Sequence, residues 1–300
     1  MLKIKIHKLQ LNNPILTASG TFGYADEFKK MLDLEKVGGA VLKGLTMNPK
    51  KGNPPPRIAE TPCGMLNSVG LQNVGVHDFI KKKLPLLKNI KLPLIANVAG
   101  ESEEENSKIV RALENAEQIK AIELNVSCPN VKQGGMIFGT NPKLLSRLVK
   151  VVRNNTTKTL IVKLSPNVTD ITEMAKIAES EGADVISAIN TLLGMAIDIN
   201  KRKPVLSNVF GGLSGPAVKP VGLRVIWQLY ESVKIPLIGI GGILTYKDVL
   251  EYIFAGASAV QVGTANFVNT RAAEKIATDL ENYCKKNNIS NIKNLIGVAH

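Results

Sequence analysis

The sequence has little cysteine. Cys63, Cys128 and Cys284 are the only three among 300 residues, and no two of them form a CxxC pair. An odd, scattered set of this kind argues against a disulfide framework or a zinc ribbon and is typical of a reducing compartment, so we expect a cytoplasmic protein without a structural metal. At this length about three quarters of the unfolded chain's surface is buried on folding, so the core does not need cross-links.

Long apolar runs are also absent. No uncharged apolar stretch reaches the roughly 18 residues that a membrane span requires. The first six residues, from Met1 to Ile6, alternate charged and apolar side chains, which is typical of a strand and unlike the apolar core of a signal peptide. We therefore expect neither export nor membrane association.

Aromatic residues make up only 4% of the chain, although 38 Lys and Arg against 25 Asp and Glu give a net charge of +13. Proteins that bind single-stranded nucleic acid usually combine basic grooves with aromatic side chains on which bases stack. Here the lysines are scattered, and the longest run is Lys81 to Lys83. We expect a solvated, lysine-rich surface that helps to attract anionic ligands, and no nucleic-acid partner.

What the sequence does contain is eight short runs of Val, Ile, Leu and Ala, separated by amphipathic stretches. Near-continuous apolar runs of this length are typical of parallel strands buried on both faces. The runs lie at residues 15–18, 40–43, 93–98, 121–126, 160–164, 184–189, 236–240 and 258–262.

The intervening segments carry helix start signals. Ser102 followed by Glu105 predicts a capping box and a helix to about residue 118. Asn141, with a proline after it, predicts an N-cap for a helix through residue 152. Thr169 and Thr245 are further N-cap candidates.

Eight strands alternating with helices, without a GxGxxG motif after the first strand, favour a (β/α)8 TIM barrel over a doubly wound sheet. Segments 44–92 and 191–234, after the second and sixth strands, are longer than ordinary loops and are expected to cover the carboxyl-terminal mouth of the barrel. The residues before Pro14 are expected to form a hairpin that closes the opposite end. We expect one domain over residues 1–300.

In such a barrel the carboxyl ends of the strands face the active site. Glycine-rich segments 239–242 and 262–265 end the seventh and eighth strands, where a phosphate commonly binds. Lys43 and Lys163 end two other strands and could form a Schiff base or stabilise an anionic flavin or carboxylate, which leaves an aldolase and a flavoenzyme open. Cys128 follows a further strand end and is a candidate base or nucleophile.

Asparagines gather near the predicted strand ends and mouth loops, a pattern that favours recognition of a planar, amide-rich ligand: Asn67, Asn97, Asn125, Asn130 and Asn190. The three histidines lie on peripheral or terminal segments. We therefore expect neither a histidine-based triad nor a metal site.

These motifs resemble dihydroorotate dehydrogenases over essentially the whole chain. The likeness is carried by Ala18-Ser19-Gly20, by the segment Asn125-Val126-Ser127-Cys128-Pro129-Asn130, and by segments 64–73, 162–167 and 211–215. Segments 95–100 and 132–135 resemble the NAD-linked class 1B. That class pairs this catalytic subunit with a second subunit that carries FAD and a 2Fe-2S cluster.

The resemblance implies FMN in the barrel mouth, dihydroorotate stacked on it, and Cys128 as the catalytic base. The residues at the family's FMN-contacting positions are Ser19, Lys43, Gly44, Asn97, Asn125, Lys163, Ile189, Gly215, Gly241, Gly242, Gly263 and Thr264. The residues at its substrate-holding positions are Lys43, Asn67, Ser68, Val69, Gly70, Leu71, Asn125, Asn190 and Thr191. Gly44 is a small departure, because relatives often have Ala or another small residue there.

The implied reaction is the oxidation of dihydroorotate to orotate in pyrimidine biosynthesis, with a hydride passing to FMN and a proton to Cys128. The chain has too few cysteines for a 2Fe-2S cluster and no NAD fingerprint, so the resemblance implies a homodimer within a heterotetramer that passes electrons to NAD. The alternatives are a fumarate-reducing class 1A homodimer, a Schiff-base aldolase, a non-catalytic binding barrel and an FMN-dependent tRNA dihydrouridine synthase. The synthase would need an RNA-binding helical domain, and no segment of this sequence remains for one.

Overall fold

A closed barrel of eight parallel strands forms the centre of the computed structural model, which describes residues 1–127 and 135–300. Each strand lies within two residues of a predicted apolar run, so the barrel prediction is confirmed. In spatial order, the strands are β3 (Ile15–Thr17), β4 (Gly39–Val41), β7 (Leu94–Val98), β8 (Ile119–Asn125), β9 (Thr159–Lys163), β10 (Val185–Ala188), β15 (Leu237–Ile240) and β16 (Ala259–Val262).

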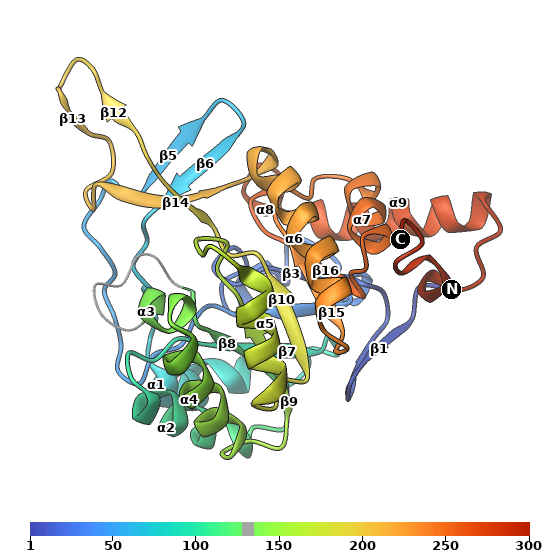
Figure 1. Ribbon diagram of the computed structural model, residues 1–300, viewed down its shortest axis with the longest axis horizontal. Helices are drawn as coiled ribbons and strands as arrows, with labels where there is room; N and C mark the ends of the chain where they lie inside the picture. Colours follow the sequence, from blue (N-terminus) through green and yellow to red (C-terminus); the bar gives the residue numbers. More distant parts are fainter. Residues whose placement is uncertain (128–134) are drawn as a thin grey trace.

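Helices surround the barrel (Figure 1). The longer ones are α2 (Glu103–Glu114), α4 (Pro142–Arg153), α5 (Ile171–Ser180), α6 (Lys219–Ser232), α7 (Tyr246–Phe254) and α9 (Ala272–Lys286). Shorter helical segments are Asp26–Phe28, Leu34–Lys36, α1 (Val76–Asp78), Phe79–Lys83, Leu84–Leu87, α3 (Gly135–Thr140), Pro216–Val218, α8 (Ala265–Val268) and Ile292–Leu295. Within the described part of the chain, none of these helices has the length and apolarity needed to cross a bilayer.

Two of the predicted N-caps are confirmed and one is displaced. The Asn141 side chain accepts hydrogen bonds from the first turn of α4, and Thr245 forms a capping box with Asp248 at the start of α7. The cap of α5 is Asp170 rather than the predicted Thr169. Both residue types can cap, but the Asp170 carboxylate also places a negative charge at the positive end of the helix dipole.

The start of α2 is confirmed, but two details differ from the prediction. Ser102 accepts a hydrogen bond from the Glu105 N–H at 3.0 Å, as in a capping box. The Glu105 carboxylate instead accepts from the N–H groups of Glu101 and Met47. It therefore ties the helix to the loop after β4. The helix ends at Glu114, four residues earlier than expected, because the chain turns there to enter β8.

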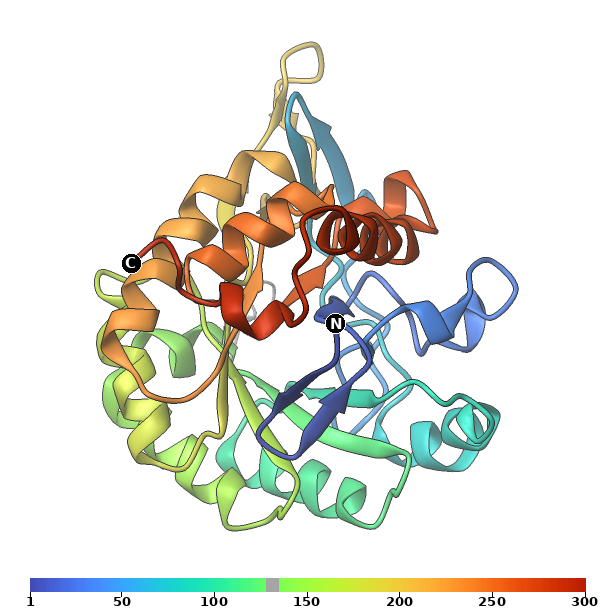
Figure 2. The same ribbon diagram turned by 90° about the vertical axis from the view of Figure 1, so that its right-hand side faces the viewer.

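The amino-terminal end of the barrel is closed by an antiparallel hairpin, β1 (Ile4–Ile6) and β2 (Leu9–Leu11), as predicted (Figure 2). Its apolar side chains, Ile4, Ile6, Leu9 and Leu11, pack against an inner layer to which every barrel strand contributes one residue. That layer consists of Leu16, Val41, Ile95, Ala121, Ile161, Val185, Ile238 and Ala259. The interior is thus filled at this end, and only the opposite end can hold a ligand.

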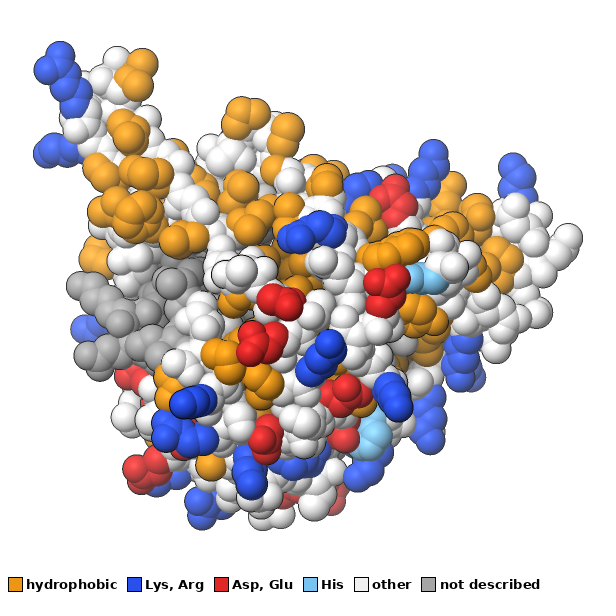
Figure 3. All heavy atoms as spheres, viewed as in Figure 1, with side chains coloured by type: hydrophobic (Ala, Val, Ile, Leu, Met, Phe, Trp, Pro, Cys, Tyr) orange, Lys and Arg blue, Asp and Glu red, His pale blue; other side chains and the backbone are white. Residues whose placement is uncertain are grey.

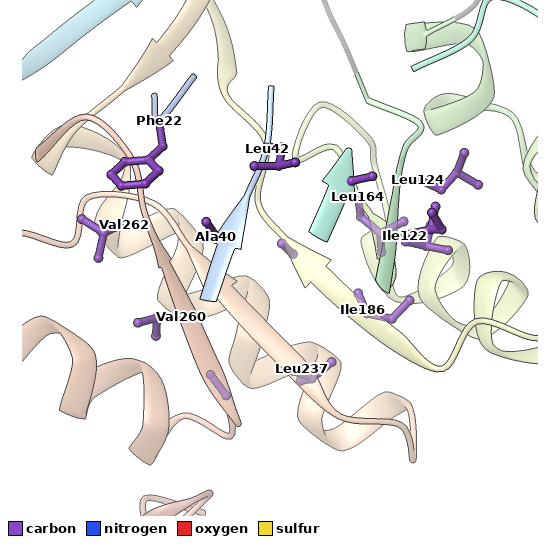
Figure 4. Close-up of a cluster of buried hydrophobic side chains, with 14 of the residues drawn as sticks. Phe22, Ala40, Leu42, Ile122, Leu124, Leu164, Ile186, Leu237, Val260 and Val262 are labelled. Carbon is purple, nitrogen blue, oxygen red and sulfur yellow. The ribbon is translucent and has the colours of Figure 1, made fainter. Parts of the chain in front are cut away.

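The opposite faces of the same strands form the larger core, between the barrel and its helices (Figure 4). Leu124, Ile186 and Val260 alternate along their strands with residues of the barrel interior and belong to this outer core. Because both faces are buried, each strand is apolar almost throughout.

Both long insertions meet above the mouth of the barrel, as predicted. β5 (Ile58–Thr61) and β6 (Gly64–Asn67) come from the first, and β11 (Leu192–Met195) and β14 (Phe210–Ser214) come from the second. They form one antiparallel sheet in the order β11-β14-β6-β5, from which the small ribbon of β12 (Ile197–Asp198) and β13 (Lys203–Pro204) projects (Figure 1).

The hairpin should contribute to the stability of the barrel. Ile6→Ala removes a side chain with no exposed surface, and we expect it to lower the free energy of unfolding by about 2–5 kcal/mol. Lys5→Ala, at an exposed position of the same strand, should change it by less than about 0.5 kcal/mol. Urea denaturation of both variants checks this, and equal effects would contradict the closing role of the hairpin.

Candidate functional site

The strand alternation that fills one end of the barrel also selects the residues at the other end. Side chains two positions beyond the inner apolar layer face the same interior, because successive residues of a strand point to opposite faces. Five of them line a cavity at the mouth, namely Ala18, Lys43, Asn97, Lys163 and Ile240. Three are fully buried beneath it, namely Glu123, Ser187 and Gln261.

The same cavity brings together most of the site residues expected from the sequence. All of the expected cofactor residues line it: Ser19, Lys43, Gly44, Asn97, Asn125, Lys163, Ile189, Gly215, Gly241, Gly242, Gly263 and Thr264. Of the expected substrate residues, it is lined by Lys43, Asn67, Val69, Gly70, Leu71, Asn125, Asn190 and Thr191.

Ser68 differs from its expected place, because it is fully buried and does not line the cavity. Its hydroxyl accepts a hydrogen bond from Asn53, and its N–H donates to Arg57. Ser68 therefore supports the loop in which the following residues, 69–71, line the cavity. Cys128 and Asn130 lie outside the described residues.

Two asparagines fix the end of β8 at the cavity. The Asn190 side-chain amide donates to the Ser127 carbonyl oxygen at 3.0 Å and to its hydroxyl at 2.8 Å. The Asn125 side-chain oxygen, Oδ1, accepts from the Ser127 N–H at 3.2 Å. Ser127 is fully buried, and it is the residue that precedes Cys128 in the sequence.

Two lysines give the cavity positive charge. Lys163 is 6% exposed, and neither it nor Lys43 forms a salt bridge within residues 1–127 and 135–300. Burial lowers the pKa of Lys43 below the ordinary lysine value; the charge of Glu27 opposes this shift and that of Arg57 adds to it. A buried and a half-buried cation, neither in a salt bridge with a described carboxylate, favour an anionic or electron-rich ligand.

Glycines shape the side of the cavity beyond β15. Gly241 and Gly242 have φ values of +127° and +67°, which side chains rarely allow. A Cβ on Gly242 would lie 2.7 Å from the Lys219 Cβ and 2.9 Å from the Gly215 carbonyl oxygen. The Tyr252 hydroxyl donates to the Gly241 carbonyl oxygen at 2.8 Å and holds this loop in place. Such a backbone suits a phosphate.

Two kinds of residue at or near the cavity were not predicted from the sequence. The first is the apolar wall that both insertions and the last loops supply: Met65, Leu213, Ile243, Leu244 and Phe267. The sequence could not predict them, because a single apolar residue in a loop does not differ in pattern from apolar loop residues outside the cavity. The second is Glu123, whose signal was clear, since a carboxylate inside an apolar strand needs hydrogen-bond partners.

The arrangement fits a planar, partly apolar ligand that carries a phosphate. Apolar side chains from the mouth sheet face polar ones at the strand ends, and glycine loops lie at one side. Within the described residues, no group of three or more His, Cys, Asp or Glu side chains could hold a metal ion. The polar groups that line the cavity include lysines, side-chain amides and hydroxyls.

Comparison with known proteins gives the family. The family model described as dihydroorotate dehydrogenase matches residues 1–284. The chain belongs to this family. Its members are flavin-dependent oxidoreductases that act on dihydroorotate.

Individual relatives agree with this assignment. The protein named "Dihydroorotate dehydrogenase B (NAD(+)), catalytic subunit" of Trichlorobacter lovleyi is 55% identical over 99% of this chain and 97% of its own length. The protein of the same name in Desulforamulus reducens is 52% identical over 100% of this chain and 98% of its own length. The crystal structure of the Eimeria tenella dihydroorotate dehydrogenase, at 23% identity, has the same fold, with a TM-score of 0.83 over 100% of this chain and 88% of that one.

The environment of Lys43 predicts unusual reactivity toward amine reagents. Because only the neutral amine reacts, labelling should rise through the pKa of each lysine. The pKa of Lys43 is lowered by burial, whereas hydrogen bonding to Asp248 raises that of Lys219. Acetylation measured by mass spectrometry against pH should give a lower midpoint for Lys43 than for Lys219. Coincident midpoints would contradict the lowering of the Lys43 pKa by burial.

Proposed function

We propose that this chain is the FMN-binding catalytic subunit of an NAD-linked dihydroorotate dehydrogenase, a single barrel domain that oxidises dihydroorotate to orotate in pyrimidine biosynthesis. The observation that carries the proposal is the cavity at the barrel mouth, which every expected cofactor residue lines. The relatives at 52–55% identity, which bear the name of that subunit, support it.

The residues of the cavity fit FMN. The glycine loop of Gly241 and Gly242 suits its phosphate, and Lys163 suits the negative charge that develops on its ring system upon reduction. The buried side-chain oxygen of Asn97, Oδ1, has no hydrogen-bond partner in the described structure and suits a ring N–H donor. When bound, FMN supplies the hydride acceptor that the side chains of this chain lack.

The substrate would lie between the flavin and the mouth sheet. Lys43 would pair with its carboxylate, while Asn67, Asn125 and Asn190 would bind the amide edges of the pyrimidine. Analogues whose ring edges do not match these half-buried amides would bind more weakly, because they forgo hydrogen bonds that the substrate makes.

Oxidation also requires loss of a proton from C5 of the substrate, and a protein base must take it. We assign this role to Cys128 from its sequence motif. The hydrogen bonds that Asn125 and Asn190 make to Ser127 support the assignment, because they tie the residue before Cys128 to two residues that line the cavity.

The electrons must then leave through another protein. A 2Fe-2S cluster needs four ligands, usually cysteines, and the chain has three scattered ones. We therefore propose a heterotetramer in which a homodimer of this chain binds subunits that carry FAD and a 2Fe-2S cluster, in the cytoplasm. Exposed apolar side chains offer surface for such contacts, among them Phe267 and Val268 of α8. Others gather on the projecting β12–β13 ribbon (Figure 3).

An anaerobic absorbance titration tests the function and its class. The purified chain should be yellow, and dihydroorotate should bleach its flavin at about one equivalent. NAD should then reoxidise it poorly, because the route to NAD needs the partner. Rapid reoxidation by fumarate would instead indicate the class 1A reaction, and a colourless chain trapped with a keto substrate by borohydride would indicate an aldolase.

Substitution of the base tests the assignment of Cys128. Cys128→Ser should slow flavin reduction by dihydroorotate by about 10²- to 10⁴-fold at pH 7, the usual worth of a general base, without loss of FMN. Cys63→Ser, at an exposed position, is the matched control and should reduce at the wild-type rate. Stopped-flow absorbance measures both. Wild-type speed in Cys128→Ser would remove Cys128 from the mechanism.

A further inference from the structure

A buried carboxylate lies beneath the floor of the cavity. Glu123, on β8, has no exposed surface. It accepts hydrogen bonds from the Asn97 side-chain amide at 2.7 Å, from the Ser187 hydroxyl at 3.1 Å and from the Gln261 side-chain amide. These donors come from three other strands, β7, β10 and β16, so the carboxylate connects opposite sides of the barrel.

This contact decides how the Asn97 amide is oriented. A carboxylate that accepts three hydrogen bonds requires N–H or O–H donors around it, so the nitrogen of Asn97 faces Glu123 and its oxygen faces away. That oxygen is buried and has no hydrogen-bond partner in the described part of the chain. A Cβ on Gly44, which lines the cavity, would lie 3.0 Å from it.

An unpartnered buried carbonyl oxygen is unfavourable unless a ligand supplies a donor. Asn97 itself lines the cavity, so a ligand there can reach it. If the amide turned over, its nitrogen would face the cavity and its oxygen would face the carboxylate, which is repulsive. Glu123 thus selects one of two orientations of a group that the cavity exposes to its ligand.

We propose that Glu123 is a positioning residue that holds Asn97 with its carbonyl oxygen presented to a ring N–H group of the bound flavin. The inference rests on the proposed function, because it takes FMN as the ligand. Ser187 and Gln261 orient the carboxylate from the opposite strands, and Asn97 makes the contact with the ligand.

The test is the FMN affinity of variants, measured by quenching of flavin fluorescence in the reconstituted chain. Glu123→Gln keeps the size of the side chain but places an amide donor among three donors, so Asn97 is free to turn. We expect the Kd for FMN to rise at least tenfold, with a shift in the visible absorption of the flavin that remains bound. Glu117→Gln, the same substitution at an exposed position just before β8, should bind within about twofold of the wild type.

A double-mutant cycle separates positioning from a general structural role. If Glu123 acts through Asn97, the variant that carries both Asn97→Ala and Glu123→Gln should bind FMN about as well as Asn97→Ala alone. The inference would be overturned if the loss of FMN affinity in the double variant equalled the product of the two single losses, or if Glu123→Gln bound FMN like the wild type. Glu123→Met, which removes the buried charge, replaces Glu123→Gln if the latter does not fold, and the same two outcomes decide.

The outcome is distinguishable from failure of the proposed function. A wild-type chain that does not bind FMN would overturn both. A wild-type chain that binds FMN and is bleached by dihydroorotate, with unchanged affinity in the Glu123 variants, would overturn only the role of Glu123.

Discussion

The two-residue alternation of the barrel strands is the constraint on which the site depends. One face of each strand must pack against helices, so only every second residue can enter the barrel. The β1–β2 hairpin fills the amino-terminal end with apolar side chains, and the inner layer above it is apolar in every strand. The next interior positions are therefore the first that polar groups can occupy with access to a ligand, and Lys43, Asn97 and Lys163 occupy three of them.

Polar groups at this depth are stable only where they satisfy one another or wait for a ligand. Glu123 satisfies three donors at once, whereas the lysines have no acidic partner in the described structure. These interior positions thus combine a pre-oriented network around Glu123 with two lysines that form no salt bridge and with the unpartnered amide oxygen of Asn97, all three of which line the cavity. Such an arrangement is costly in an empty barrel and favourable around an anionic, planar ligand, which is the chemistry that the family's flavin and substrate share.

The sequence predicted the barrel well, because its strands are buried on both faces and their apolar runs are unambiguous. Prediction failed where two neighbours were chemically equivalent or where a contact was distant in the chain. Thr169 and Asp170 can both cap a helix, and only the backbone path selects Asp170. Ser68 lies within a motif whose neighbours line the cavity, yet its hydroxyl faces Asn53. Glu123 was visible as a charge in an apolar strand, but its donors lie on strands that only the closed barrel brings near.

The pairing of the two insertions completes the site in a way that no local pattern could reveal. β6 and β14 are almost 150 residues apart, and their register places Asn67 beside Gly212 and Met65 beside Ser214. A Cβ on Gly212 would collide with the Thr191 side chain at 2.0 Å, so this position must be glycine for the second insertion to fold over the mouth. The Asn67 amide donates to the Gly212 carbonyl oxygen, which couples an expected substrate residue to this closure. The walls of the cavity are therefore fixed by contacts between insertions, whereas its floor is fixed by the barrel, and the proposed substrate site lies where the two meet.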